Sequence, residues 1–402
     1  MSFISPDITT DLFFQVNWQS GPVRHTEAYA ARRVNLYRDL LPPRVYDSLM
    51  KKQSGDRFRL AHQAGEIIGA PSLSQTLRLS KKQFDPHRLS IADLVPRVGR
   101  FYPKGLLRDV SGIFSSNGEP FRCVEVSGKD LVVNLNHPLS GKATTMRITV
   151  GKVEPKPVER GGVSLDWPQI ITEGVGMQAR WQERPTDFFS GHPFERDDVE
   201  PDALFYENPR LVQHLDDTAL DVVREVHGRF LRNGMHALDL MSSWQTHLPE
   251  GLMLERLAAI GLNAVELSKN EALTDWTISD LNANPVLPYA TSSFDAVLCA
   301  LSVEYLIHPL EVFAEVARVL KPGGAFVVTF SNRWFPPKAI GIWKELHDFE
   351  RMGLVLEYFL AGGRYGGLQT YSLRGLERPR NDQYWGKTAH SDPVYAVWGL
   401  SR

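Results

Sequence analysis

Residues 205–217, FYENPRLVQHLDD, bring together side chains suited to acid–base chemistry and ligand binding. An Asn-Pro pair inside this segment is a helix-start signal, and apolar residues follow it at helical spacing, so we expect a helix here. On such a helix Arg210, His214 and Asp217 project within about 60° of one another, away from the apolar residues. His214 is the best candidate for a general base, because the ordinary pKa of histidine lies near neutrality. The alternative interpretation is the solvated polar face of an amphipathic helix.

A second polar segment follows an apolar run at 325–330 and contains Asn332 and Arg333. The planar guanidinium of Arg333 suits a carboxylate or phosphate group on a ligand, although an ordinary surface arginine is the alternative. The candidate substrate-binding residues from the two segments are therefore Tyr206, Arg210, Asp217, Asn332 and Arg333.

Four short apolar runs position these polar segments, at 236–241, 256–262, 293–301 and 325–330. Nearly unbroken apolar runs of this length are typical of strands buried on both faces of a parallel sheet. Helical stretches lie between them, for example at 309–320. The alternation predicts a doubly wound α/β domain, whose ligands bind outside the carboxyl ends of the strands, where the strand order reverses.

The part of the chain before residue 155 has a different pattern, of short strands and turns. Apolar and polar residues alternate over 12–18, 131–135 and 146–150, which is the period of a half-buried strand. We expect the last two strands to form an antiparallel pair around the loop 136–142, and a helix near 43–51. The segment 156–205 is rich in Pro, Gly and charge, which predicts a tether whose aromatic side chains act as anchors. The predicted domains are thus 1–155 (mainly β) and 206–402 (α/β), joined by the tether.

Composition excludes several classes of protein. The chain has 402 residues, of which 43% are hydrophobic and 23% charged, with 45 Lys and Arg against 47 Asp and Glu. No apolar run approaches the ~18 residues that a membrane-spanning helix needs, and the N-terminus has no secretory signal pattern, so we expect a cytoplasmic protein. The two cysteines, Cys123 and Cys299, are far apart and lie near no ligand cluster, so we expect neither a disulfide scaffold nor a metal site. The net charge of -2 gives no electrostatic case for nucleic acid.

Three landmarks occur in order within 287–324: Leu-Pro-Tyr at 287–289, Ser-Phe-Asp-Ala-Val at 293–297 and Leu-Lys-Pro-Gly-Gly at 320–324. This set resembles the middle of a class I S-adenosylmethionine (SAM)-dependent methyltransferase, and with the flanking strands the resemblance covers about 200–400. It implies a Rossmann-like fold, SAM as cofactor and S-adenosylhomocysteine (SAH) as product. The cofactor-binding residues that it implies lie at the strand ends: Asp239, Met241, Ser242, Ser243, Gly261, Asn263, Asp280, Leu281, Ala300 and Ser302.

Methyl transfer is an in-line displacement that needs alignment and, for an oxygen or nitrogen acceptor, often a base. The resemblance makes His214 the candidate base and Tyr305, which follows the fourth strand of the domain, the residue that orients the acceptor. A histidine with a purely structural role is the alternative for His214.

Two positions depart from the usual methyltransferase pattern. The glycine-rich loop after the first strand is replaced by Met-Ser-Ser-Trp at 241–244, although the serine hydroxyls could bind the SAM carboxylate. The acid that normally ends the second strand and binds the ribose falls at Gly261, with Asn263 two residues on and Glu266 about a turn into the next helix. The stretches 239–249 and 332–339 resemble a methyltransferase type 11-like subfamily with a DLMSSW-type variant motif. The alternative is a methyltransferase fold that has lost its cofactor.

Residues 132–153 resemble the last strands of SlyD-like, FKBP-type peptidyl-prolyl isomerases, where an Asn-His-Pro-Leu-Ala-Gly segment leads back from an inserted flap. Here that segment reads Asn-His-Pro-Leu-Ser-Gly at 136–141, and 40–60 loosely matches the stretch before the insertion. The resemblance implies an FKBP-like domain at 1–155 with a flap at about 70–130. The aromatic and Asp residues of the isomerase pocket do not match, so we expect a protein-binding or structural module without isomerase activity.

The leading hypothesis is a SAM-dependent methyltransferase that acts on a small-molecule or protein acceptor, with the FKBP-like module recruiting the substrate. The alternative is a protein-binding chaperone or scaffold, or a prolyl isomerase-like protein, with a vestigial methyltransferase fold. A nucleic-acid methyltransferase is a weaker third hypothesis, because 97–108 is the one short basic and aromatic stretch. The sequence leaves the acceptor and the oligomeric state open.

Overall fold

A computed structural model describes residues 3–88, 94–155 and 162–402, and it divides into two compact units. The first comprises Met1–Ser190 together with Glu345–Gly353, and the second comprises Gly191–Lys344 and Leu354–Arg402. The break at residue 190 falls inside the segment that the sequence predicts to be a tether. Among the described residues, no helix is both long and apolar enough to cross a membrane.

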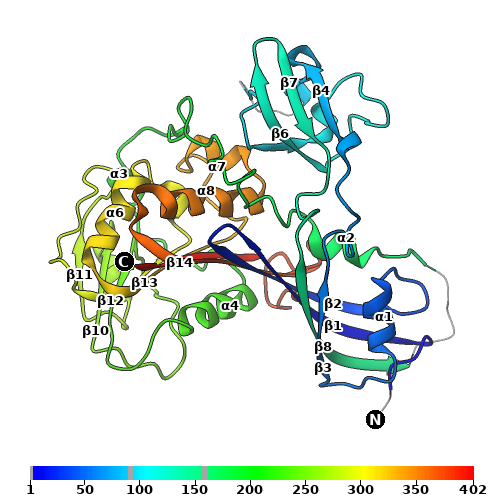
Figure 1. Cartoon of the computed structure of the whole chain (residues 1–402). Helices are drawn as coiled ribbons and strands as arrows, with labels where there is room; N and C mark the ends of the chain where they lie inside the picture. The colour runs from blue at the N-terminus through cyan, green and yellow to red at the C-terminus, as the bar shows by residue number, and fades with distance from the viewer. Residues whose placement is uncertain (1–2, 89–93, 156–161) are drawn as a thin grey trace. The chain divides into compact units, whose positions relative to one another are not determined.

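The second unit is built on a mixed sheet with the strand order β11-β10-β9-β12-β13-β15-β14. Figure 1 labels five of these strands, β10 to β14. The first five strands run parallel, and β15 runs antiparallel to both of its neighbours. Their bounds are β9 His236–Leu240, β10 Arg256–Gly261, β11 Asp275–Ile278, β12 Phe294–Ala300, β13 Leu320–Phe330, β14 Tyr365–Arg374 and β15 Val394–Ser401. The chain runs outward from β9 to β11 and then returns to the other side of β9, so the strand order reverses between β9 and β12.

The apolar runs form these strands because their side chains are buried on both faces. Leu238 and Leu240 of β9 and Ile260 of β10 are fully buried. The predicted doubly wound α/β domain is therefore confirmed. The helices of this part of the chain are α3 Asp202–Phe205, α4 Asp217–Gly228, α5 Ala264–Lys269, α6 Pro309–Val319 and α7 Gly341–Glu345, and α8 Asp348–Leu360 carries the chain from the first unit back into the second.

The helix predicted from the Asn-Pro pair begins later than expected. Its first residue is Asp217, and the N-cap is Asp216, whose carboxylate accepts a hydrogen bond from the Ala219 N–H at 3.1 Å. Residues 206–216 are irregular, and Leu211 and Val212, whose spacing suggested a buried helical face, are 46% and 57% exposed. The prediction of a helix over this segment is wrong, because Leu211 and Val212, which were to form its buried face, are exposed, although Leu215 is buried.

The first unit contains an antiparallel sheet with the order β2-β1-β8-β3. The bounds are β1 Ile8–Ser20, β2 Val23–Asn35, β3 Arg57–His62 and β8 Thr144–Pro155, and helix α1 is Pro43–Leu49. Burial alternates strictly along β1, so the predicted half-buried strand at 12–18 is confirmed, as is the helix near 43–51. A second sheet, with the order β4-β7-β6-β5, lies between β3 and β8 in the sequence: β4 Thr76–Ser80, β5 Phe101–Pro103, β6 Pro120–Ser127 and β7 Asp130–Asn134.

The predicted antiparallel pair around 136–142 is wrong. Strand β7 pairs with β4 and β6, whereas β8 pairs with β1 and β3, so the loop connects two different sheets. Each strand finds better-matched partners elsewhere in the chain, which alternation alone does not reveal. Beyond β8, helix α2 (Trp167–Thr172) buries Trp167, whose indole N–H donates to Asp39 at 3.0 Å, in agreement with the predicted role of aromatic anchors.

Candidate active site at the strand ends

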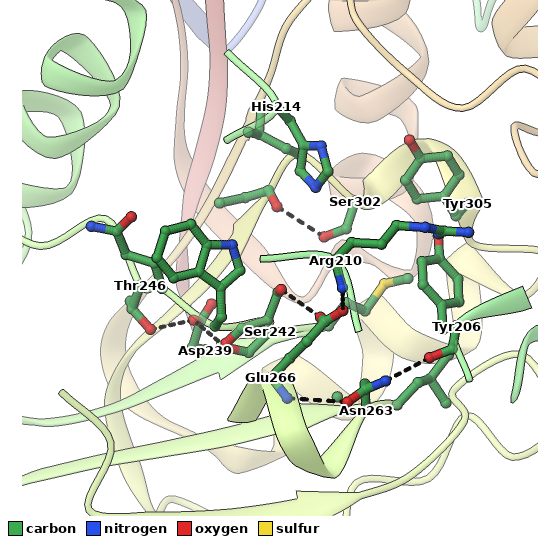
Figure 2. A pocket seen from close by; sticks show the side chains of 18 of the residues that line it. Tyr206, Arg210, His214, Asp239, Ser242, Thr246, Asn263, Glu266, Ser302 and Tyr305 are labelled. Carbon is green, nitrogen blue, oxygen red and sulfur yellow. Dashed lines mark hydrogen bonds between the residues drawn. The ribbon is translucent and has the colours of Figure 1, made fainter. Parts of the chain in front are cut away.

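A cavity of about 230 Å³ lies at the carboxyl ends of β9, β10, β11 and β12, where the strand order reverses. All of the residues that line it belong to the second unit. In Figure 2, Asp239, Ser242 and Thr246 lie at one end of the cavity, and Tyr206 and Tyr305 lie at the other. We call the first the loop end. The second, which we call the acceptor end, comprises Tyr206, Arg210, His214, Tyr305, Arg333 and Phe335.

The loop after β9 is tied to the strand that precedes it. Met241 has a left-handed backbone with φ of 54°, a conformation that favours glycine. The hydroxyls of Ser242 and Thr246 both donate to the Asp239 carboxylate, at 2.6 and 2.5 Å. Burial raises the pKa of Asp239 to about 6, and these two hydrogen bonds oppose the shift. Asp239 therefore fixes the shape of a loop that has lost its glycines.

The missing acid at the end of β10 has a steric cause. A Cβ atom on Gly261 would lie 2.4 Å from the backbone oxygen of Ser242, because the Ser242 N–H donates to Ile260 and draws the loop over the strand. A side chain is therefore excluded at the position where an acid was expected.

Glu266 supplies an acid to the same region from the first turn of α5. Its side chain is buried and lines the cavity, and its two oxygens accept hydrogen bonds from the Ser243 hydroxyl and the Arg210 backbone N–H, both at 2.6 Å. Figure 2 shows the contact with Arg210. From the sequence, Glu266 is expected only to lie about a turn into the helix that follows the missing acid. The spacing from Asn263 to Glu266 is that of an N-cap and the third helical residue, which places the carboxylate at the start of α5, whereas its direction toward the loop is visible only in the structure.

Asn263 lines the cavity, but its side chain is used to position other residues. Its oxygen accepts from the N–H groups of Val265 and Glu266, and its nitrogen donates to the carbonyls of Tyr206 and Glu207. A role in holding the cofactor stays a prediction for Asn263. The other predicted cofactor residues that line the cavity are Asp239, Met241, Ser242, Ser243, Gly261, Asp280, Leu281, Ala300 and Ser302.

The residues after β11 and β12 are held by their own loops. Asp280 accepts a hydrogen bond from the Asn282 N–H at 2.9 Å, and Leu281 is buried. The Ser302 hydroxyl donates to the Ala300 carbonyl at 3.2 Å. Leu301 between them has φ of 55°, so left-handed residues follow both β9 and β12, the two strands that flank the reversal of strand order. Strain at such positions is commonly found at functional sites.

His214 and Arg210 meet at the acceptor end, although no helix carries them. The His214 ring contacts Phe335 edge-on at 5.2 Å, and desolvation is the main cause that lowers the pKa of His214. A lowered pKa keeps the imidazole neutral at pH 7, as a base requires. Arg210 lies over the Phe205 ring at 4.1 Å and donates from Nη2 to the Phe205 carbonyl at 3.0 Å.

Two predicted substrate residues lie outside the cavity. Asp217 is exposed at the start of α4 and accepts from Asn381 at 3.3 Å, because the helix that was to align it with His214 begins only at this residue. Asn332 is exposed beside Ser331 and does not line the cavity, whereas its neighbour Arg333 does. The structure therefore does not bring Asp217 and Asn332 to the cavity, and a substrate role for them stays a prediction.

Tyr305 lines the cavity as predicted, but its hydroxyl already has a partner. The Tyr305 hydroxyl oxygen accepts a hydrogen bond from the Phe335 N–H at 2.9 Å, and the two rings stack at 6.1 Å. Burial raises the pKa of Tyr305 well above its ordinary value, so the group stays protonated and retains its proton for donation.

A buried polar cluster that the sequence did not reveal supports the acceptor end. Asp202 accepts two hydrogen bonds from Arg196, at 2.8 and 2.9 Å, and lies 3.2 Å from Nζ of Lys338, a side chain with no exposed surface. Asn282 also donates to Asp202, at 2.8 Å, and to the Tyr305 carbonyl. These contacts fasten the segment that leads to Tyr206 and Arg210 onto the loops that follow β11, β12 and β13.

Comparisons with known proteins agree with the methyltransferase prediction. Residues 251–328 match the family model described as a methyltransferase domain. A stretch of 102 residues is 29% identical to the biotin biosynthesis bifunctional protein BioHC of Teredinibacter turnerae, covering 25% of this chain and 17% of that protein. The matched region is thus a small part of either protein.

Similar solved structures include SAM-dependent methyltransferases. One from Aquifex aeolicus is 21% identical, with a TM-score of 0.31, and the match covers 50% of this chain and 97% of that chain. One from Mesorhizobium loti is 15% identical, with a TM-score of 0.29, and the match covers 45% and 99%. Likenesses at these TM-scores carry no argument about the site. The match over 251–328 supports a methyltransferase domain with SAM as its cofactor.

Proposed function

We propose that this chain is a SAM-dependent methyltransferase that transfers a methyl group to a small-molecule or protein acceptor in the cavity at the ends of β9–β12. One observation carries the proposal. The methyltransferase family match over 251–328 includes β10, β11 and β12, whose carboxyl ends line the cavity where the strand order reverses.

The residues present suit a cofactor that carries an amino acid, a ribose and a purine. At the loop end, Ser243 and Glu266 supply hydroxyl and carboxylate groups, and Asp280 and Leu281 supply a polar and an apolar contact after β11. The backbone of Ser242 leaves no room for an acidic side chain at position 261, so Glu266 takes the place of the acid that binds the ribose hydroxyls. When bound, SAM supplies an electrophilic methyl group on a sulfonium.

The acceptor end supplies alignment and a base. His214 would accept the proton of an oxygen or nitrogen nucleophile on the acceptor, while SAM, when bound, would supply the methyl group and leave as SAH. Tyr305 holds the backbone of Phe335, which in turn contacts His214 edge-on, so Tyr305 acts on the acceptor through its neighbours.

For the first unit we propose substrate recruitment by an FKBP-like module. The sheet of β4–β7, which lies in the sequence between β3 and β8, is the support, because an inserted flap is what the FKBP resemblance implies. The identity of the protein or small-molecule partner and a cytoplasmic location stay predictions.

A scaffold with a vestigial site is the second candidate function, and one contact favours it. The Trp244 indole N–H donates to the Val212 carbonyl at 3.2 Å, and Gln245 bonds Gln213, so the loop after β9 is joined to the segment that lines the opposite side of the cavity. These bonds would have to open, or leave room beneath them, for a cofactor to enter.

Thermal unfolding with SAH separates the two candidates. A ligand that binds only the folded state stabilises it by about 2.7 kcal/mol at a hundredfold excess over Kd, so 1 mM SAH should raise Tm by several degrees. Met241→Arg should abolish this shift by filling the loop end, whereas Met253→Arg, at a residue that is 74% exposed, should retain it. No shift and no binding heat with wild-type protein at millimolar SAH or SAM would reject the methyltransferase function.

A further inference from the structure

The two ends of the cavity differ in charge. Two arginines, Arg210 and Arg333, line the acceptor end and flank His214, whose pKa both of them lower. Four acids line the cavity, and each has partners within the chain. Asp202 is held by Arg196 and Lys338, and Asp239 is buried under the hydroxyls of the loop end. Glu266 accepts from the Ser243 hydroxyl and the Arg210 backbone N–H, and Asp280 accepts from the Asn282 N–H, so none of the four pairs with the guanidinium of Arg210 in the described parts of the chain.

Arg210 is held in place but lacks an ionic partner. Its backbone N–H is fixed by Glu266, and its guanidinium lies on the Phe205 ring and donates from Nη2 to the Phe205 carbonyl. No carboxylate in the described parts of the chain forms an ion pair with it, and its buried Nη1 finds no hydrogen-bond acceptor there. A buried donor without an acceptor is costly, so Nη1 of Arg210 calls for a ligand oxygen.

Arg333 adds positive charge at the rim of the same end. Its one ion pair within the described residues is a 3.7 Å contact with Asp392, and the same carboxylate oxygen accepts from Arg378 at 2.6 Å. The guanidinium of Arg333 lies over the Tyr384 ring at 4.5 Å, which fixes its position without neutralising it. Around the arginines stand the flat faces of Tyr206, Tyr305 and Phe335.

We propose that Arg210 binds a carboxylate of a ligand in this cavity. If that carboxylate belongs to the methyl acceptor, the aromatic faces around Arg210 suit a planar anionic molecule. This proposal rests on the proposed methyltransferase function, in which the cofactor and the methyl acceptor bind in the same cavity. Planar guanidinium and carboxylate match each other in two parallel hydrogen bonds, which neither a neutral amide nor an alcohol reproduces. The carboxylate can come from the methyl acceptor or from the amino-acid end of the cofactor, and these sources are separable by experiment.

The test uses four compounds on the full-length chain, by calorimetry. For the acceptor, 4-hydroxybenzoate and 4-hydroxybenzamide are compared in the presence of saturating SAH. For the cofactor, SAH is compared with 5′-methylthioadenosine, which lacks the amino-acid end. Each compound is titrated into wild type, Arg210→Gln and Arg380→Gln, the last as a control at an exposed arginine that does not line the cavity.

We expect Arg210→Gln to weaken one carboxylate compound at least tenfold and to leave its neutral counterpart within twofold, with no change in Arg380→Gln. Loss of 4-hydroxybenzoate binding alone assigns the carboxylate to the acceptor, and loss of SAH binding alone assigns it to the cofactor. Equal weakening of a charged compound and its neutral counterpart, or no weakening, overturns the proposal.

The failure of the proposed function would look different. A wild-type chain that binds 4-hydroxybenzoate through Arg210 but binds neither SAH nor 5′-methylthioadenosine keeps the carboxylate site and rejects the methyltransferase. A wild-type chain that binds none of the four compounds rejects both.

Discussion

Two buried aspartates line the same cavity and are held in opposite ways. Asp202, in α3, lies between the cations of Arg196 and Lys338 and also accepts from Asn282. Asp239, at the end of β9, has two hydroxyls and no cation among its recorded partners. Burial opposes ionisation of both, but the hydrogen bonds and charges around Asp202 lower its pKa, whereas the pKa of Asp239 is raised to about 6.

The opposite pKa shifts imply opposite effects of the two carboxylates on the stability of the fold. A carboxylate whose pKa is lowered on folding stabilises the fold above its ordinary pKa and loses that contribution on acidification. A carboxylate whose pKa is raised has the opposite sign, because the folded state then disfavours the charged form that the unfolded chain accepts. At neutral pH the Asp202 carboxylate therefore stabilises the segment that leads to the acceptor end, whereas the charge on Asp239 lowers the free energy of unfolding.

The largest effect is expected from Asp202→Asn. This change removes a negative charge that pairs with the buried side chains of Lys338 and Arg196. Breaking a buried ion pair in this way costs about 3–5 kcal/mol of unfolding free energy. Urea denaturation measures the loss. In the double variant Asp202→Asn/Lys338→Met the cost should fall, because the buried ammonium, which keeps only Asp198 as a carboxylate partner among the described residues, is removed as well.

The matched control is Asp221→Asn, which breaks the exposed Arg224–Asp221 pair. That change should cost less than about 1 kcal/mol. Equal losses at Asp202 and Asp221 would show that the buried cluster does not fasten the segment.

The contrast with Asp239 is sharpest as a function of pH. The pKa of Asp239 is raised from 3.8 to about 6 on folding, and this shift corresponds to roughly 3 kcal/mol in the free energy of unfolding. That stabilisation is fully present below pH 3.8 and is lost as the pH rises through 6. Asp239→Asn removes this dependence, so the variant should gain stability relative to wild type between pH 4.5 and pH 8. Urea titrations at both pH values test the sign. A difference between variant and wild type that does not change with pH would contradict the account.

The two regions also differ in how much the sequence reveals. The sequence predicts strands β9, β10, β12 and β13 because each is a continuous apolar run. Neighbouring residues of a strand point to opposite faces, so such a run indicates burial on both faces of the sheet. The sequence does not predict the conformation of 206–216, because that conformation depends on hydrogen bonds to Glu266 and Asn263, more than fifty residues away. A local helix-start signal was outweighed by these distant hydrogen bonds.

The site shows the same division. Residues at strand ends, such as Ser242 and Asp280, are placed at the cavity by the strand pattern together with the methyltransferase resemblance, and both line it. The pairing of Lys338 with Asp202 joins segments 136 residues apart, and no spacing rule reports it. Glu266 lies between these cases, since the N-cap spacing after Asn263 was readable and only its direction toward the loop required the structure.

A smaller effect tests why the second strand lacks its acid. Gly261→Asp places a Cβ atom 2.4 Å from the Ser242 oxygen, so we expect a loss of about 1–3 kcal/mol from overpacking, and weaker SAH binding because the loop shifts. Gly118→Asp is the control, since nothing lies within 4 Å of a Cβ atom there. If Gly261→Asp bound SAH more tightly than wild type, an acid would be tolerated at this position and the steric explanation would be wrong.

The smallest effect concerns the backbone of the loop end. Met241 is left-handed, with φ of 54°, which costs a residue with a side chain about 1 kcal/mol relative to glycine. Met241→Gly should therefore raise the unfolding free energy slightly, or leave it unchanged once the greater entropy of the unfolded glycine chain is included. Met253→Gly, at an exposed residue that is not left-handed, has only the entropic term and should lose about 0.5–1 kcal/mol. If the two variants lose equal stability in urea denaturation, Met241 is not strained. If Met241→Gly is the more stable of the two and binds SAH more tightly, the methionine is a restraint on the loop that Asp239 holds.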